Sequence, residues 1–507
     1  MRIFLDLIFK KLYLAAFGLV VFLIFIDLSY LGLNTADASL YLSTAENIAN
    51  HTGFVVSDNL YQYFNTLYHP AFPYYQPLYS LFASLFINHG GIVRVIQINI
   101  LIFVFNAMFV LYIIQRLMPT KFNILFALYL VLSMNFYLSA LYAWTEQFHF
   151  FCLFIVCLLF LKYSKDPRQL IWLGALNGVL MLIRVAHFYN FAAFLAVLMI
   201  GKDPLRRKFE KALLLAGGFI LTFGLYQLFC LLRYHVFYPE CPRSAMSYEL
   251  AHHFTGIIYS PNAVGIHVIL GSIFTIKNLA NIAHHIGEFC QQMPIISYAI
   301  FIYYFLAEDK KQDGGGVKLF FLQGLFTIAG YSFTFYSVTR FPNYEIIRYS
   351  LIPYVLLSLG GWYCLFQALS FSNTLAKKIL CGFFWVCLIY SQAIKCSDFG
   401  SSISHRLFWH KPFYMNLKES YGWIDKNLPE RILVASADDQ QNYFMHRPFV
   451  SLPPGRSFNC PNLTLFNKIY SPDYYLLSRA VPDRCFALIP HTIIHTNDIF
   501  RLYKVTK

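Results

Sequence analysis

Long apolar stretches alternate with short polar segments along most of this chain. A helix needs about 20 apolar residues to cross the roughly 30 Å hydrocarbon core of a bilayer. Stretches near this length predict eleven spans, near residues 12–33, 92–115, 122–141, 147–163, 170–184, 188–201, 212–234, 294–306, 319–338, 349–369 and 378–394. The pattern therefore predicts an α-helical polytopic membrane protein.

The composition agrees with this interpretation. Hydrophobic residues make up 58% and charged residues 13% of the 507 residues, against roughly 45–50% and about 25% in soluble domains. Such values exclude a disordered chain, a collagen and a small disulfide-bonded domain. The net charge of +14 does not indicate a nucleic-acid partner, because the basic residues are scattered through short loops and form no nucleic-acid-binding motif.

The distribution of lysine and arginine predicts an orientation. Basic residues are enriched in the predicted loops at 116–121, 162–168 and 202–211, and loops with such an excess stay on the cytoplasmic side. We therefore expect a cytoplasmic N-terminus and a C-terminal tail on the outer side. We also expect the first span not to be cleaved, because its apolar run of about 22 residues is longer than the core of a signal peptide. A bacterial inner membrane is preferred over the endoplasmic reticulum.

Two domains are expected. Residues 1–395 form the membrane domain, with outer loops at 34–91 and 235–293, and residues 396–507 form a small α/β domain outside the membrane. In this tail the pattern predicts helices at Met415–Lys426 and Leu463–Tyr470, and strands at Arg431–Ala437, Tyr474–Ser478, Ala487–Ile494 and Ile499–Val505.

Two carboxylates stand at predicted water–lipid boundaries on the outer side: Asp37 follows the first span, and Glu146 opens the fourth. Each has a simpler explanation, Asp37 as the N-cap of an amphipathic helix over Leu40–Asn50 and Glu146 as a first-turn partner of the helix dipole. Because both lie at the outer boundary, we expect them to face one another. Two carboxylates also suit Mg²⁺ or Mn²⁺, and the sequence leaves open whether a metal takes part.

Cationic residues fall at the same predicted level. Arg184 ends the fifth span and is followed by His187, while Arg340, Arg348 and Tyr349 bracket the loop before the tenth span. A side chain that reaches lipid phosphates explains each single arginine equally well. Several of them on one face, opposite two carboxylates, would suit a bound phosphate group.

The first outer loop holds a segment rich in proline and aromatic residues, from His69 to Tyr79, which includes Tyr75 and Gln76. Such a composition is typical of an ordered loop that lies at the membrane surface. An aromatic belt that only anchors the protein is the alternative.

In their order along the chain, these segments resemble the GT-C glycosyltransferases, multi-spanning enzymes that take a sugar from a polyprenyl-phosphate donor. The resemblance is closest to the branch with the protein O-mannosyltransferases and the lipid A aminoarabinose transferases, and it covers most of the chain. The similar segments are Asp37–Tyr41 with the helix after it, His69–Tyr79, Thr145-Glu146, Gly174–Gly178 followed by Arg184, Arg348-Tyr349 with Pro353, and Trp423–Asn427.

The chain departs from the family pattern in two places. Ala38 follows Asp37 where the family often has a second acidic residue, and Gln76 stands where some members carry a lysine. The phosphate contact of that loop would then fall to Arg184 or Arg348.

The resemblance implies a role for each candidate residue. Asp37 would be the base that activates the acceptor, and Glu146 would orient the acceptor or help to hold a divalent cation. The cations Arg184, Arg340 and Arg348 would offset charge on the departing phosphate. The remaining substrate-binding candidates are Tyr41, His69, Tyr75, Gln76, His187 and Tyr349.

The chemistry of such a donor fits these residue types. A polyprenyl phosphate departs as an anion without a proton, so the enzyme needs a base near the acceptor and positive charge near the leaving group. Direct displacement would invert the anomeric centre of the sugar. The sugar is not readable from the sequence, nor is the acceptor, which could be a lipid, a glycan or a protein.

Other functions are compatible with a polytopic chain. A transporter or flippase of lipid-linked sugars would line a path with intramembrane charges and show repeat symmetry, whereas the charges here gather at one face and no repeat is visible. A ligase or polymerase of surface polysaccharide is a second alternative, against which the long early loop with Asp37 argues. A membrane scaffold whose tail binds a partner is the third.

Overall fold

The computed structural model describes residues 14–23, 36–54, 76–89, 91–117, 127–128, 130–131, 134–142, 144–201, 203–234, 319–320, 322–327, 355, 411–430, 432–436, 449–451, 467, 471–479 and 489–506. Contacts divide the chain into two compact units. The first comprises Met1–Ile24, Leu101–Ala140 and Thr145–Ser401, and the second comprises Phe25–Ile100, Leu141–Trp144 and Ser402–Lys507. The predicted domain boundary at residue 395 lies outside the described residues.

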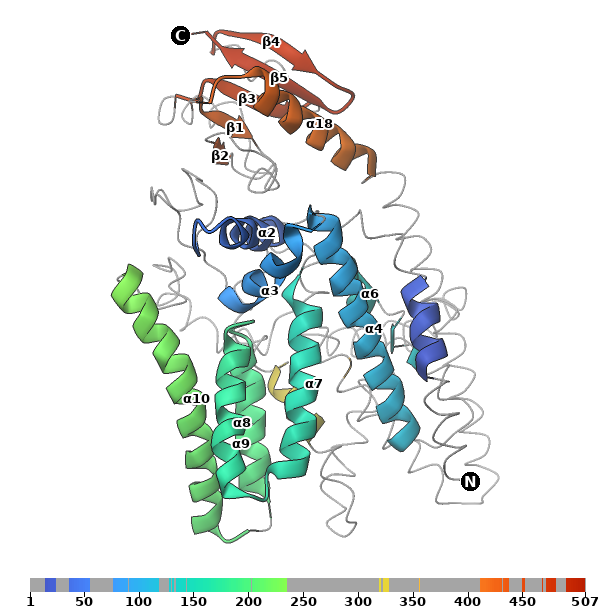
Figure 1. Ribbon diagram of the computed structural model, residues 1–507, viewed down its shortest axis with the longest axis vertical. Coiled ribbons are helices and arrows are strands. Elements are labelled where there is room, and N and C mark those ends of the chain that lie inside the picture. Colours follow the sequence, from blue (N-terminus) through green and yellow to red (C-terminus); the bar gives the residue numbers. More distant parts are fainter. Residues whose placement is uncertain are drawn as a thin grey trace, which may run out of the picture. The chain divides into compact units, whose positions relative to one another are not determined.

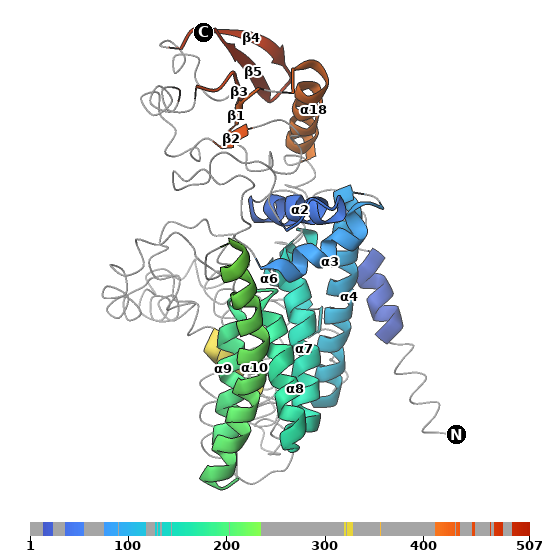
Figure 2. The ribbon, with the colours of Figure 1, turned by 60° about the vertical axis from the view of Figure 1, so that its left-hand side comes forward.

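Apolar helices make up the described part of the first unit (Figure 1). They include Leu14–Leu23, most of α4 (Gly91–Leu117), α6 (Met134–Leu141), α7 (Thr145–Tyr163), α8 (Pro167–Met181), α9 (His187–Ile200) and α10 (Leu205–Tyr234). The helices α7 to α10 run side by side, as Figure 2 also shows.

Three helices in the described part of the chain are long and apolar enough to cross a membrane, namely Gly91–Gln115, Thr145–Tyr163 and Leu205–Leu232. They confirm the predicted apolar helices at 92–115, 147–163 and 212–234, and the protein is a helical membrane protein with several spans. The total of eleven spans stays a prediction, because the stretches at 294–306 and 378–394 lie outside the described residues.

Glycines bring α8 and α10 into close contact. A methyl group on Gly174 of α8 would collide with the carbonyl oxygen of Leu215, and one on Gly218 of α10 would collide with that of Ile171. Gly174 and Gly178 have the four-residue spacing that lets two membrane helices approach until their backbones touch. The contact therefore fixes both the distance and the rotation of the two helices.

The opposite face of α10 is apolar and exposed. Phe209, Leu213 and Ile220 are 51%, 71% and 65% exposed. In a helix that crosses a membrane, such a face contacts lipid. Near the start of α10, the Lys211 ammonium lies 2.6 Å from the Asp203 carboxylate, and this hydrogen bond holds the pKa of Asp203 below its ordinary value.

In the second unit, α2 (Ala36–Ala49) and α3 (Pro77–Ile87) pack against each other. The helix α2 buries Ala38, Tyr41 and Ala45, which lie on one face of a helix. The amphipathic helix that the sequence predicts at Leu40–Asn50 is confirmed, and it begins four residues earlier than expected, at Ala36. Asp37 consequently lies in the first turn of α2.

The helix α3 forms in a stretch that the sequence analysis assigned to a loop. Gln76 before it has an extended backbone, with φ −61° and ψ 143°, and Pro77 occupies the first turn. Proline is favoured in the first turn of a helix, because a backbone N–H there has no hydrogen-bond partner within the helix and its absence costs no bond. The ring of Tyr79 meets that of Tyr41 edge-on, with centroids 5.3 Å apart, and this contact ties α3 to α2.

The C-terminal part of the second unit is a five-stranded mixed sheet with one described helix, α18 (Lys411–Asn427). The strands are β1 (Val434–Ser436), β2 (Phe449–Ser451), β3 (Tyr474–Ser478), β4 (His491–Thr496) and β5 (Phe500–Val505). Their order in the sheet is β2-β1-β3-β5-β4, with β1 parallel to β2 and β3 and with β5 antiparallel to β3 and β4. This confirms a small α/β arrangement in the tail.

One apolar cluster holds α18 on this sheet. Leu417, Tyr421 and Ile424 of the helix pack with residues of β1, β3 and β5. Asn497, in the turn between β4 and β5, donates to the Asn416 carbonyl oxygen at 2.7 Å and accepts from the backbone N–H of Phe500 at 2.8 Å. A single side chain thus fixes both the turn and the helix.

The glycine contact gives a direct test of this packing. In Gly218→Ala, the added methyl group meets the backbone of α8, so we expect the free energy of unfolding to fall by about 1–3 kcal/mol. Gly217→Ala is the matched control, because nothing lies within 4 Å of its added methyl group. The thermal midpoint of the two purified variants in detergent checks this, and equal midpoints would contradict the close contact.

Candidate active site

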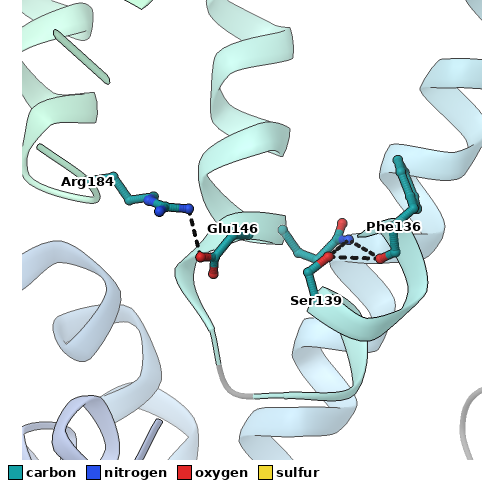
Figure 3. Close-up of polar contacts among 5 residues, drawn as sticks. Phe136, Ser139, Glu146 and Arg184 are labelled. Atoms are coloured by element: carbon teal, nitrogen blue, oxygen red, sulfur yellow. Dashed lines mark hydrogen bonds and ion pairs between the residues drawn. The ribbon is translucent and has the colours of Figure 1, made fainter. Parts of the chain in front are cut away.

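Glu146 lies in the first turn of α7 and is fully buried. Its Oε1 atom is 2.7 Å from Nη1 of Arg184, and both side chains are shielded from solvent. Figure 3 shows the guanidinium of Arg184 directed at the carboxylate. Because an isolated buried charge is costly, the pairing stabilises both groups by neutralising each with the other.

Arg184 stands in the tight turn that joins α8 to α9. The backbone N–H of Arg184 donates to the Leu180 carbonyl oxygen at 3.2 Å, and the Arg184 carbonyl oxygen accepts from the N–H of His187 at 3.0 Å. The turn is thus bonded to the helix before it and to the helix after it. This local geometry aims the side chain of Arg184 across to the start of α7.

Gln147 makes the second polar connection of α7. Its Nε2 atom donates to the Phe136 carbonyl oxygen at 2.9 Å and to the hydroxyl of Ser139 at 2.7 Å. Its Oε1 atom accepts from Nδ2 of Asn106 at 2.8 Å. Figure 3 shows Phe136 and Ser139 on the neighbouring segment. Gln147 therefore joins α7 to α6 and to α4 beside Glu146.

His149 makes the third connection, one helical turn after Glu146. Its Nε2 atom lies 3.0 Å from Nδ1 of His187, at the start of α9. The Nε2 atom of His187 lies 2.9 Å from Oδ1 of Asn177, in α8. All three side chains are fully buried.

The structure brings together Glu146, Arg184 and His187 of the residues that the sequence analysis singled out. Tyr41 and Gln76 are both buried in the second unit, Tyr41 against Tyr79 and Gln76 just before α3. The expected site residues His69, Tyr75, Arg340, Arg348 and Tyr349 lie outside the described residues, as does the side chain of Asp37. Their roles stay predictions.

The direct pairing of Glu146 with Arg184 was not expected. The sequence places Glu146 and Arg184 at one predicted boundary but does not show that they touch, so its separate roles for them, at the acceptor and at the leaving phosphate, did not include a direct contact. Nor does the sequence by itself assign a role to Gln147, His149 or Asn177. The sequence does carry one signal for such residues: they are polar residues inside apolar stretches, where each needs a buried hydrogen-bond partner.

The expectation that Asp37 and Glu146 hold a divalent cation stays a prediction, because the side chain of Asp37 lies outside the described residues. The guanidinium of Arg184 occupies the Oε1 side of Glu146, and a divalent cation would be repelled by that neighbour. No group of three metal-ligating side chains converges among the described residues. The arrangement instead provides a buried arginine whose charge is balanced by a carboxylate.

Comparison with solved structures finds a similar fold in membrane proteins of the kind that the sequence resemblance implied. The archaeal oligosaccharyltransferase AglB from Archaeoglobus fulgidus, solved with an inhibitory peptide and a dolichol-phosphate, is similar with a TM-score of 0.50 and 13% identity. The similarity covers 93% of this chain and 70% of AglB. At this identity the comparison shows the fold alone.

ArnT from Cupriavidus metallidurans is also similar over 97% of both chains. The TM-score is 0.48 with 10% identity for the structure bound to undecaprenyl phosphate, and 0.44 with 12% identity for the apo structure. No family model and no curated protein matches the sequence.

The buried ion pair gives a second prediction. Glu146→Gln and Arg184→Met each leave one charge buried without its opposite, so each should lower the free energy of unfolding by about 3–5 kcal/mol. The double variant should lose less than the sum of the two, because it removes both charges. Unfolding in detergent measures the three values.

Lys162→Gln is the control for this prediction. It removes a charge that lies in the last turn of the same helix and is exposed to solvent, so no buried charge loses its opposite. We expect little change in its thermal midpoint. Strictly additive losses for Glu146→Gln and Arg184→Met would show that the two residues do not depend on each other.

Proposed function

We propose that this protein is an integral-membrane glycosyltransferase that moves a sugar from a polyprenyl-phosphate donor to an acceptor on the outer face of the membrane. The observation that carries the proposal is the buried Glu146–Arg184 pair at the start of α7, within a fold similar to that of AglB. The proposal also places the N-terminus in the cytoplasm and the C-terminal sheet in the periplasm, in agreement with the distribution of lysine and arginine.

Arg184 is suited to the departing phosphate. A guanidinium offers several N–H donors in a planar fork that matches phosphate oxygens, and one of these donors already meets Glu146. Its burial lowers the effective dielectric, which strengthens its attraction for an anion. In the proposed mechanism, Arg184 stabilises the negative charge that develops on the lipid phosphate as the sugar leaves.

Asp37 is the proposed base. It lies in the first turn of α2, on a helix whose Ala38, Tyr41 and Ala45 are buried in the second unit. The carboxylate takes the proton of the acceptor as the acceptor atom attacks the anomeric carbon. The bond from that carbon to the phosphate oxygen breaks with its electron pair, so polyprenyl phosphate leaves as an anion and the anomeric configuration inverts.

In this proposal, the opposite charges of Glu146 and Arg184 also affect how the site binds and releases the phosphate. With its charge compensated, Arg184 stays in place between turnovers without a bound anion. Glu146 in turn limits how tightly the product phosphate is held, because the carboxylate competes for the same guanidinium. No step is assigned to a metal.

The proposal is tested by sugar transfer in membranes that carry Asp37→Asn. Loss of the base should lower kcat by about a hundred- to ten-thousandfold at normal expression. Glu46→Gln is the matched control, since Glu46 is the other carboxylate of α2, and we expect it to transfer sugar at close to the wild-type rate.

The donor sugar for this assay is identified first, by mass spectrometry of glycolipids and envelope glycans from a strain that lacks the protein. Wild-type transfer by Asp37→Asn would remove the base assignment. Absence of transfer by the purified wild-type protein, with movement of the intact lipid-linked sugar across vesicles, would favour a flippase.

A further inference from the structure

A chain of three buried polar side chains links α8, α9 and α7. It runs from Asn177 through His187 to His149, with heavy-atom distances of 2.9 Å and 3.0 Å. None of the three side chains is exposed. Nothing in the proposed mechanism uses them chemically, yet buried polar groups at such distances form a defined hydrogen-bonded network.

Asn177 determines which ring nitrogen of each histidine carries the proton. Nδ2 of Asn177 donates to the Leu173 carbonyl oxygen at 2.7 Å, which turns Oδ1 of Asn177 toward His187. That oxygen only accepts, so Nε2 of His187 carries the proton and donates it. In a neutral ring, Nδ1 of His187 is then an acceptor, and Nε2 of His149 donates to it. Both rings are thereby held as neutral Nε2–H tautomers.

This chain is attached to Arg184 through the backbone. The N–H of His187 donates to the carbonyl oxygen of Arg184 at 3.0 Å. Arg184 and His187 are three residues apart, as are Glu146 and His149 on α7. Two parallel links therefore join α7 to the α8–α9 turn, one an ion pair and the other a contact between two imidazoles.

We propose that Asn177, His187 and His149 form a positioning chain that holds the guanidinium of Arg184 in place. The side chain of His187 is fixed from two directions, by α8 and by α7, so the turn that carries Arg184 cannot rotate without breaking one of these hydrogen bonds. A buried N–H or lone pair that loses its partner is destabilising, because it has given up water without regaining a hydrogen bond. His149 acts here as a positioning residue, through His187 and Arg184.

The inference rests on the proposed function in one respect, the role of Arg184 as the ligand of the lipid phosphate. Its consequence is that the hydrogen-bonding capacity of His149 matters for phosphate binding, although His149 itself need not touch the ligand. A purely structural role would depend on the shape of the side chain and not on its N–H group.

Binding of undecaprenyl phosphate to the purified full-length protein in detergent tests this. His149→Leu removes the donor to His187 and should weaken binding about tenfold. His149→Gln keeps an N–H close to the position of Nε2 and should retain most of the affinity. Asn177→Ala, which leaves α7 unchanged, should give a loss similar to that of His149→Leu.

Asn190→Ala is the matched control. Asn190 is another buried polar residue of α9, and it donates to Thr327 at 2.8 Å rather than joining the chain. We expect its affinity to stay near that of the wild type. The thermal midpoints of all variants show whether they are folded. If His149→Leu does not fold, the affinity of Asn177→Ala decides the question.

The outcomes separate this inference from the proposed function. Wild-type protein that does not bind undecaprenyl phosphate would overturn the proposed function, and the inference with it. Wild-type binding together with an unchanged affinity of the folded His149→Leu or Asn177→Ala variant would overturn the inference alone. An equal loss of affinity in His149→Gln and His149→Leu would also overturn the inference, because the effect would then come from the shape of the side chain and not from its N–H group.

Discussion

A carboxylate that has no water around it has to be neutralised, and this constraint organises the start of α7. Glu146 meets it through Arg184, at 2.7 Å. The polar residues beside it are paired in the same region, Gln147 with α4 and α6 and His149 with α9. Because apolar surroundings offer no competing solvent, these contacts hold the start of α7 to three helices and one turn with little freedom.

The position of Arg184 depends in turn on the close approach of two helix backbones. Gly174 and Gly178 let α8 lie against the backbone of α10, and the turn with Arg184 follows α8 directly. Larger residues at these positions would move α8 away and shift Arg184 with it, so close helix packing and electrostatics act on the same side chain. The proposed positioning chain through His187 adds a third restraint.

The sequence predicts the helices well, because burial in lipid leaves a long apolar signal such as Thr145–Tyr163. It also predicts β3 at Tyr474–Ser478, where the strand found has the same bounds. It fails for α3, since an apolar segment of 11 residues opened by proline is too short for a span and resembles a loop. The pairing of Glu146 with Arg184 could not be predicted for another reason. Hydropathy shows where each helix lies in the sequence, but it does not show which helices become neighbours.

The order of Glu146 and Arg184 along the chain bears on biogenesis. The ribosome completes α7 before α8 and the turn after it, so the carboxylate reaches the bilayer ahead of its counterion. A lone charge at the bilayer centre costs about 2.5–3.5 kcal/mol on insertion scales and less toward the headgroups. The ion pair between Glu146 and Arg184 can therefore form only after α8 and the turn that follows it have been synthesised.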